Sequence, residues 1–180
     1  MEAAQIRSFV DDTYRRAYGA RHAAAFGEYL STGAGGRAAL GYRRAGAAPL
    51  YLEAYLDDPV ETLVSAALRR PVPREAIVEI GNLAADNAWS MIALWGDAAN
   101  DLGGTSEVVV ATLTAPLRRM FCRIGVPLRA LMRAEPERLG NDAADWGSYY
   151  ALDPVVCAGS IAEGQRAIGA FLTRRRERTA

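Results

Sequence analysis

Arg74-Glu-Ala-Ile-Val-Glu-Ile-Gly-Asn-Leu-Ala-Ala-Asp-Asn-Ala-Trp89 is the stretch that decides the fold. Its β-branched run predicts a buried strand from Ile77 to Leu83. The chain then turns directly into a helix from about Ala88 to Leu102, in which apolar residues recur at spacings of three and four. Asp86 and Asn87 can each cap that helix by accepting the free amide protons of its first turn. The stretch therefore predicts a strand and a helix beside one core.

Glu79 is the unexpected residue of this strand, because its neighbours Val78 and Ile80 are apolar. A buried, ionised carboxylate must find a partner or shift its pKa. A strand that brings a carboxylate close to a helix N-terminus can hold an anionic or acyl-carrying ligand. Two interpretations stay open: Glu79 is a general base, or it forms a structural ion pair with a buried arginine.

The composition of the chain is that of one globular domain. Its 180 residues are 51% hydrophobic and 23% charged, so we expect a single domain over residues 1–180, with 174–180 as a frayed, charged tail. Acidic and basic residues balance at 21 each, which gives no field that favours nucleic acid. No signal peptide is visible, and no apolar run approaches the roughly 18 residues that span a bilayer. We expect a cytoplasmic protein that does not insert into membranes.

The scarcity of histidine and cysteine excludes several kinds of chemistry. A zinc site would have to be built almost without imidazole, because His22 is the only histidine and there is no Cys-x-x-Cys pair. A Ser-His-Asp site would depend on His22, in a stretch without a G-x-S-x-G turn. Cys122 and Cys157 lie in apolar patterns and are expected to be buried thiols. We therefore expect no metal site and assign acid–base chemistry to carboxylates or tyrosines.

The remaining patterns predict a mixed α/β or α+β fold. Apolar spacing predicts helices over residues 3–17, 23–30, 59–70 and 114–125. Strands are predicted over residues 37–45, 50–56, 107–113, 126–133 and 155–161, with an irregular loop over 134–148. This order predicts one mostly antiparallel sheet flanked by helices.

Four motifs together resemble the bacterial thermostable hemolysin family. They are Tyr18-Gly-Ala-Arg21, Glu53-x-Tyr-Leu-Asp57, Glu79-Ile-Gly-Asn-Leu-Ala84 and Asp145-Trp-Gly-x-Tyr-Tyr-x-x-Asp-Pro154. That family is similar to the acyl-homoserine-lactone synthases and to the wider GNAT acyltransferase fold. The resemblance implies a GNAT-like sheet in which two central strands, here 77–83 and 107–113, splay apart. The pantetheine arm of the acyl donor would lie in the gap.

The resemblance also implies an activity: transfer of an acyl group from a thioester to an amine in a small biosynthetic pathway. The co-substrate would be an acyl thioester of a carrier protein or of coenzyme A, the acceptor a small amine, and no cofactor would be permanently bound. Glu79 lies where a glutamate of the lactone synthases is thought to deprotonate the acceptor. Glu53 and Asp57 would position the acceptor amine, or alternatively serve as a strand-end residue and a helix cap. Tyr150 or its neighbour Tyr149 would protonate the departing thiolate, although aromatic packing is the plainer use of both.

The remaining site assignments concern the acyl donor. Asn82 would hydrogen-bond pantetheine or close off the splayed strand, and Trp146 would line the substrate site. Arg21 and Arg118 would grip phosphate or a carrier protein, although a solvated helix face is the plainer interpretation of Arg118. The donor phosphate would face the backbone amides between the strand and the helix. These amides belong to the segment that contains Leu83, Ala84 and Asn87.

The segment between strand and helix departs from the GNAT pattern. Enzymes of that fold that use coenzyme A carry a Gln/Arg-x-x-Gly-x-Gly/Ala loop, whereas residues 83–89 contain no glycine and add Asp86. A carboxylate there repels pyrophosphate, which favours a carrier-protein thioester as donor. The lactone synthases carry an arginine where Asn82 stands.

Two other functions remain possible for this sequence. The family name implies a membrane-acting hemolysin, against which the chain shows no spanning segment and no strongly cationic amphipathic helix. A non-catalytic module that kept the fold and binds acyl groups is the second alternative.

Overall fold

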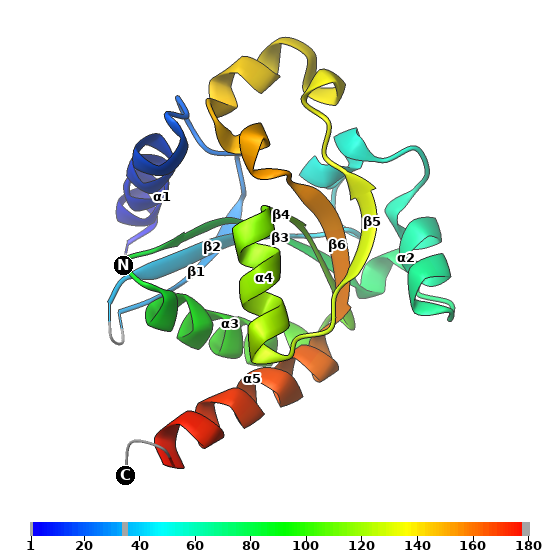
Figure 1. Cartoon of the computed structure of the whole chain (residues 1–180). Helices are drawn as coiled ribbons and strands as arrows, with labels where there is room; N and C mark the ends of the chain where they lie inside the picture. Colours follow the sequence, from blue (N-terminus) through cyan, green and yellow to red (C-terminus); the bar gives the residue numbers. More distant parts are fainter. Residues whose placement is uncertain (1, 34–35, 178–180) are drawn as a thin grey trace.

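The computed structural model describes residues 2–33 and 36–177, which build a six-stranded sheet with helices on both faces (Figure 1). The strand order is β1-β2-β3-β4-β6-β5. The strands are β1 (Glu28–Thr32), β2 (Ala38–Arg44), β3 (Ile77–Ala85), β4 (Val108–Leu113), β5 (Arg129–Arg133) and β6 (Val155–Ser160). Only β3 and β4 pair in parallel among the described strands, so the predicted mostly antiparallel sheet is confirmed.

The helices divide between the two faces of the sheet (Figure 1). They are α1 (Ala3–Tyr18), α2 (Val60–Leu68), α3 (Ala88–Gly103), α4 (Ala115–Ile124) and α5 (Ile161–Glu177). Side chains alternate along each strand, so Ile80 of β3 packs with α3, α4 and α5, whereas Ile77 faces α2. Short 3₁₀ segments complete the described chain: η1 (Tyr51–Tyr55), η2 (Arg74–Ala76), η3 (Pro136–Trp146) and η4 (Tyr149–Leu152).

The two central strands part halfway along their length. β3 and β4 pair from Ile77–Val108 to Glu79–Val110, and beyond this point the two strands no longer pair although both continue. On its other side β3 bulges, because Asn82 and Leu83 together lie opposite one residue of β2. Asn82 adopts a left-handed φ of 51°, which asparagine tolerates better than most residues. The predicted splayed pair is confirmed.

Three sequence predictions of secondary structure were wrong. Residues 23–30 form no helix, since β1 begins at Glu28, and residues 50–56 form the 3₁₀ segment η1 rather than a strand. No helix was predicted after β6, yet α5 follows it and includes residues 174–177 of the expected frayed tail; residues 178–180 lie outside the described part. Gly164 and Gly169 weaken the local helix signal of α5, which forms because it packs against α3 and α4.

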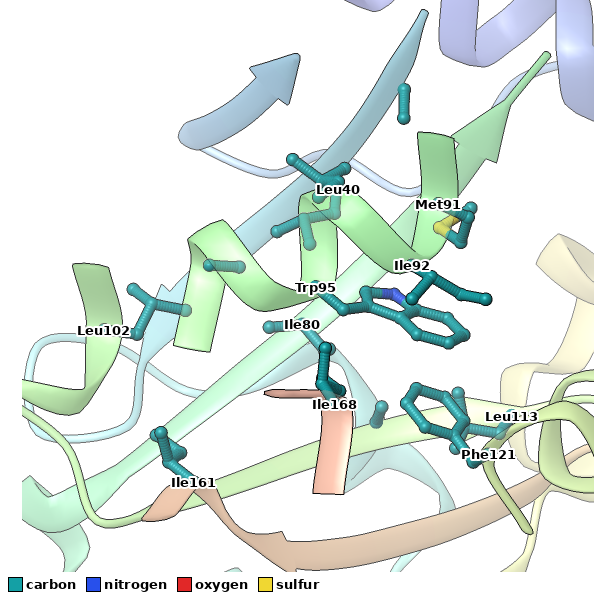
Figure 2. Close-up of a cluster of buried hydrophobic side chains, with 14 of the residues drawn as sticks. Leu40, Ile80, Met91, Ile92, Trp95, Leu102, Leu113, Phe121, Ile161 and Ile168 are labelled. Atoms are coloured by element: carbon teal, nitrogen blue, oxygen red, sulfur yellow. The ribbon is translucent and has the colours of Figure 1, made fainter. Parts of the chain in front are cut away.

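The core between the sheet and α3, α4 and α5 is centred on two aromatic rings (Figure 2). Trp95 of α3 stacks on Phe121 of α4 with ring centroids 3.9 Å apart and an interplanar angle of 16°. Cys157 is buried at this core, and its burial raises the pKa of the thiol to about 11. Cys122 is exposed, contrary to the prediction, because it lies on the solvent side of α4.

Candidate active site

Glu79 is directed away from the α3–α4–α5 core, into the opposite face of the sheet. Its side chain is only 3% exposed, and it occupies the last position at which β3 and β4 still pair. One carboxylate oxygen, Oε2, accepts the backbone N–H of Tyr51 at 2.7 Å, and Oε1 accepts that of Leu52 at 3.0 Å. The carboxylate therefore binds the N-terminal end of η1.

Burial raises the pKa of Glu79 to about 7, although the two backbone hydrogen bonds act in the opposite direction. No arginine forms an ion pair with Glu79 within the described ranges, so the expected buried ion pair is not what satisfies this carboxylate. Arg43, its register partner on β2, instead donates to the carbonyl oxygens of Pro49 and Ala25. Because each carboxylate oxygen accepts only one N–H, each keeps a lone pair that can take a proton.

A small pocket of about 40 Å³ opens beside Glu79, and we call it the Glu79 pocket. It lies where β3 and β4 part, between Ile80–Leu83 on one strand and Thr112 on the other. Six of its lining residues carry hydroxylated or indole rings: Tyr14, Tyr18, Tyr51, Tyr55, Trp146 and Tyr149. The pocket therefore combines one carboxylate with aromatic walls.

Trp146 is the centre of these aromatic walls. Its ring lies 6.1 Å from Tyr14, 5.9 Å from Tyr51 and 5.2 Å from Tyr149, measured between centroids. Burial raises the pKa of the Tyr51 hydroxyl to about 12, and the neighbouring Trp146 indole acts in the opposite direction. Tyr14 and Tyr18 were not assigned to the site from sequence, but their spacing of one helical turn places both on one face of α1 and was the available signal.

Two of the four sequence motifs, Tyr18–Arg21 and Asp145–Pro154, contact each other beside these aromatic walls. The backbone N–H of Arg21 donates to the carbonyl of Asp145 at 2.8 Å, and that of Ser148 donates to Tyr18 at 2.8 Å. A Cβ atom at Gly147 would lie 2.1 Å from the Tyr18 carbonyl oxygen, so only glycine fits there. These contacts hold Trp146 in place.

Gly81 is required for a similar reason on β3. The ring of Phe26, which is buried, lies across this strand and β2, and a Cβ at Gly81 would approach its Cζ to 2.6 Å. Phe26 also lines the Glu79 pocket. The glycine of the Glu79-Ile-Gly-Asn motif thus allows an aromatic ring to close one wall.

The structure places the two carboxylates assigned to the acceptor outside the Glu79 pocket. Glu53 accepts two hydrogen bonds from the guanidinium of Arg74, at 2.6 and 2.8 Å, and the contact with Arg74 holds the pKa of its carboxyl below the ordinary value. Glu53 also accepts the N–H of Leu50, so it anchors η1. The carboxylate of Asp57 accepts a hydrogen bond from Arg138, and the cap position of α2 is Pro59.

Tyr150, the predicted acid, also lies beside the pocket rather than among its lining residues. Its hydroxyl is 2.7 Å from that of Tyr55, and its ring packs edge-on against Tyr149. Tyr149 lines the pocket instead and donates from its hydroxyl to the carbonyl of Thr112 at 3.3 Å. Burial raises the pKa of both Tyr149 and Tyr150.

Both residues at the bulge of β3, Asn82 and Leu83, line the Glu79 pocket, and Asn82 also makes structural hydrogen bonds. Asn82 is buried and donates from Nδ2 to the Ala24 carbonyl at 2.7 Å and to the Tyr29 hydroxyl at 3.0 Å, which ties the bulge to the segment before β1. Ala84, the next residue but one after Asn82, is buried against Tyr14, Trp146 and Tyr149. A bulge leaves its extra residue out of the strand ladder, so its backbone amide can face the gap.

The turn between β3 and α3 is held by side chains of its own. Asn87 caps α3, because its side chain accepts the N–H of Ser90 at 2.9 Å. Asp86 does not share this role. Both of its carboxylate oxygens bind Arg37 instead, at 2.8 to 3.2 Å, and this contact lowers the pKa of Asp86. The charge that the sequence predicts at the phosphate site is thus paired with a guanidinium.

Neither arginine assigned to phosphate lines the Glu79 pocket. The side chain of Arg21 is 78% exposed and contacts Asp145 at 3.2 Å. Arg118 is not a solvated residue of α4: it donates to the carbonyls of Leu113 and Asp153 and to the Asp153 carboxylate. Arg118 therefore holds the loop around Asp153 in place, whereas the guanidinium of Arg21 makes an exposed ion pair.

A second, apolar cavity of about 70 Å³ lies on the other face of the sheet, between it and α3, α4 and α5. Its walls include Trp95, Phe121, Cys157 and Gly164, and Ile80 lines both this cavity and the Glu79 pocket. The two spaces are therefore neighbours across β3, where it has separated from β4. A chain that enters the gap near Glu79 would find apolar walls beyond Ile80.

Neither a metal cluster nor a membrane helix is found in residues 2–33 and 36–177. There is no group of three or more histidine, cysteine, aspartate or glutamate side chains that could hold a metal ion. No helix of this part combines the length and the apolar character needed to cross a bilayer.

Comparisons with known proteins give one family and one fold. A family model described as thermostable hemolysin matches residues 1–165. Curated protein sequences give no significant match. Among solved structures, TofI in an apo form is 18% identical, with a TM-score of 0.57 and coverage of 94% of this chain and 91% of that one.

Two further solved structures have the same fold and describe acyl chemistry. BjaI, a CoA-dependent acyl-homoserine lactone synthase with SAM and isopentyl-CoA, is 16% identical over 94% of this chain and 79% of its own, with a TM-score of 0.54. FeeM, an N-acyl amino acid synthase from uncultured soil microbes, is 14% identical over 91% of this chain and 93% of its own, with a TM-score of 0.53. At these identities the likeness shows the fold, which is that of the lactone synthases.

Proposed function

Since this chain belongs to the thermostable hemolysin family and has the fold of acyl-transferring synthases, we propose that it is an N-acyltransferase. It would move an acyl group from a thioester to the amine of a small acceptor. The observation that carries this proposal is Glu79, a buried carboxylate with a pKa of about 7 at the point where β3 and β4 part. A general base works best when its pKa lies near the working pH.

The first step is attack of the acceptor amine on the thioester carbonyl. Glu79 takes the amine proton, directly or through one water, with the lone pairs that Tyr51 and Leu52 leave unused. The bulge at Asn82 and Leu83 can aim a backbone N–H at the carbonyl oxygen, where negative charge develops. Charge on that oxygen is stabilised best by donors that are already in place.

The second step releases the thiol, which needs a proton. We assign the role of proton donor to Tyr149 rather than to Tyr150, because of these two residues only Tyr149 lines the Glu79 pocket. Its hydroxyl already lies at the separated part of β4, against the carbonyl of Thr112. Tyr150 would then position Tyr149 through its edge-on contact.

The donor would lie in the gap, with its acyl chain in the apolar cavity beyond Ile80. That cavity, of about 70 Å³, is roughly half of the 150 Å³ known to hold benzene in a protein core. We therefore propose a donor with a short acyl chain. The comparison proteins include a synthase named as CoA-dependent and one named for N-acyl amino acids, so a thioester of coenzyme A or of a carrier protein and an amino-acid-like amine define the classes to test.

A direct test incubates the purified chain with short acyl thioesters and a panel of amino acids. Mass spectrometry of the products and thiol release then separate three results. Amide product with equivalent thiol release is the expected result. Donor that is bound and retained without turnover would indicate the acyl-binding module. Lysis of cells or vesicles, with neither amide product nor retained donor, would indicate the hemolysin interpretation.

A further inference from the structure

The three tryptophans of the chain differ in how their indole nitrogen is satisfied. Trp89 is 37% exposed, and the indole of Trp146 lies beside the hydroxyl of Tyr51, whose pKa it acts to lower. Trp95 is 3% exposed, and its Nε1 has no acceptor within the described residues. A buried donor without a partner is costly, so the position of Trp95 needs an explanation.

The ring of Trp95 lies where the central strands have separated. It stacks on Phe121, and Figure 2 shows both rings close to Leu113 at the end of β4. The labelled neighbours of the indole are apolar, and the nitrogen lies on the ring edge next to Ile92 (Figure 2). Because the ring is held by stacking, the N–H cannot turn toward a distant acceptor.

Packing alone does not account for an indole at this position. A phenyl ring would stack on Phe121 without leaving a buried donor unpaired. An acceptor that enters the gap beside the ring would pair this N–H and remove the cost of leaving it unpaired. The acceptor must be neutral, because Trp95 borders a cavity with almost entirely apolar walls, where a charged oxygen would lose its hydration without a cation in compensation.

We propose that the Trp95 indole N–H donates a hydrogen bond to a neutral carbonyl oxygen of the acyl-thioester donor held between β3 and β4. The inference rests on the proposed function and adds a recognition residue to it. Two parts of the donor supply such an oxygen: an amide of the pantetheine arm, or a carbonyl on the acyl chain itself, as in a 3-oxoacyl group. The test distinguishes them.

The test uses a non-reactive thioether analogue of acyl-pantetheine and protein labelled with ¹⁵N in the tryptophan indoles. Three indole signals are expected, and the signal that disappears in Trp95→Phe is assigned to Trp95. Calorimetry measures binding of the analogue independently. We expect the Trp95 indole proton to shift downfield and to exchange more slowly with water when the analogue binds.

The saturated and 3-oxo analogues of equal chain length identify the oxygen. A shift with both supports a pantetheine carbonyl, and a shift with the 3-oxo analogue alone supports a carbonyl on the acyl chain. Binding by calorimetry without any change at Trp95 overturns the inference and leaves the proposed function standing. If no analogue binds, the proposed function fails and the inference fails with it.

Kinetics provide a second readout. Loss of one neutral hydrogen bond in Trp95→Phe should raise KM for the donor about 2- to 10-fold with little change in kcat. Phe121→Leu is the matched control, because it disturbs the same stack but keeps the indole N–H. A downfield shift that persists in Phe121→Leu supports hydrogen bonding; equal KM changes in both variants, with no downfield shift, would show that only packing matters.

Discussion

The Oε2 atom of Glu79 lies 2.7 Å from the backbone nitrogen of Tyr51, and this hydrogen bond joins the centre of β3 to η1. The residues are 28 apart in the chain, and Leu52 makes the matching bond to Oε1. The same carboxylate is thus the proposed base and the acceptor that holds η1. Changes at Glu79 will therefore affect both rate and stability, and each can be measured separately.

Replacement of Glu79 by Gln should lower turnover by about 10²-fold or more, because the amide cannot accept the amine proton. Gln keeps one acceptor oxygen but turns an NH₂ group toward the second backbone N–H. An unpaired buried N–H costs about 1–3 kcal/mol, so we also expect a lower melting temperature. Turnover measured below the melting transition, beside chemical denaturation, separates the two effects.

The matched control for this variant is Glu53→Gln, which weakens the bond to Arg74 outside the Glu79 pocket. It should lower stability while the folded protein keeps most of its rate. Full activity of Glu79→Gln would end the case for Glu79 as the base.

The rate and the stability should depend on pH in opposite directions. The pKa of Glu79 in the folded chain, about 7, lies above its ordinary value of 4.5, so the folded state holds this proton more tightly. The resulting stability is fully present below about 4.5 and is lost as pH rises through about 7. Meanwhile kcat/KM should rise through pH 7 as the base ionises. Wild-type profiles identical to those of Glu79→Gln would contradict this assignment.

Gly164 offers a test of the acyl cavity. It is buried in α5 and lines the cavity, and a Cβ there would meet nothing closer than Val126 at 4.0 Å. Gly164→Leu should fill the space, keep the fold, and lower kcat/KM for the longer accepted acyl donors by roughly tenfold or more. Gly169→Leu is the control, since Gly169 is an exposed glycine of the same helix. Equal chain-length profiles for both variants would place the acyl group elsewhere.

We expect a carrier-protein thioester to be a better donor than the coenzyme A thioester. The side chain of Asn87 already occupies the Ser90 amide at the start of α3, and Asp86 stays ionised beside it. The pyrophosphate of coenzyme A would therefore meet the Asn87 side chain and the Asp86 carboxylate. Asp86→Asn should improve kcat/KM with coenzyme A donors by roughly two- to five-fold. The hypothesis fails if the unchanged protein uses coenzyme A donors at least as efficiently as carrier-protein donors.

The hemolysin interpretation is tested with vesicles. No described helix is suited to cross a bilayer, and we expect the folded protein to release no dye from liposomes at concentrations that saturate acyl transfer. Vesicles with detergent added provide the positive control. Release by pure, folded protein would overturn this expectation.

The sequence alone determined β3 and α3 around Glu79, whereas the splayed strand pair was implied only by the resemblance to a known family. A β-branched run that leads into a capped helix is a local pattern, and local hydrogen bonding and side-chain periodicity are enough to form it. Glu79 was identifiable for the same reason, because a carboxylate in an apolar strand conflicts with its neighbours. The aromatic motif at 146–150 was also visible, although sequence favoured Tyr150 where the structure places Tyr149 in the pocket.

Only the tertiary structure decided what surrounds Glu79. The amides of η1, the rings of α1 and the indole of Trp146 come from segments far apart in the chain, and no local period encodes their meeting. The same holds for Glu53, whose partner Arg74 removes it from the site, and for α5, whose glycines conceal a helix that forms by packing. A local pattern fixes which face a side chain presents, whereas the contacts of that face depend on how the whole chain closes around it.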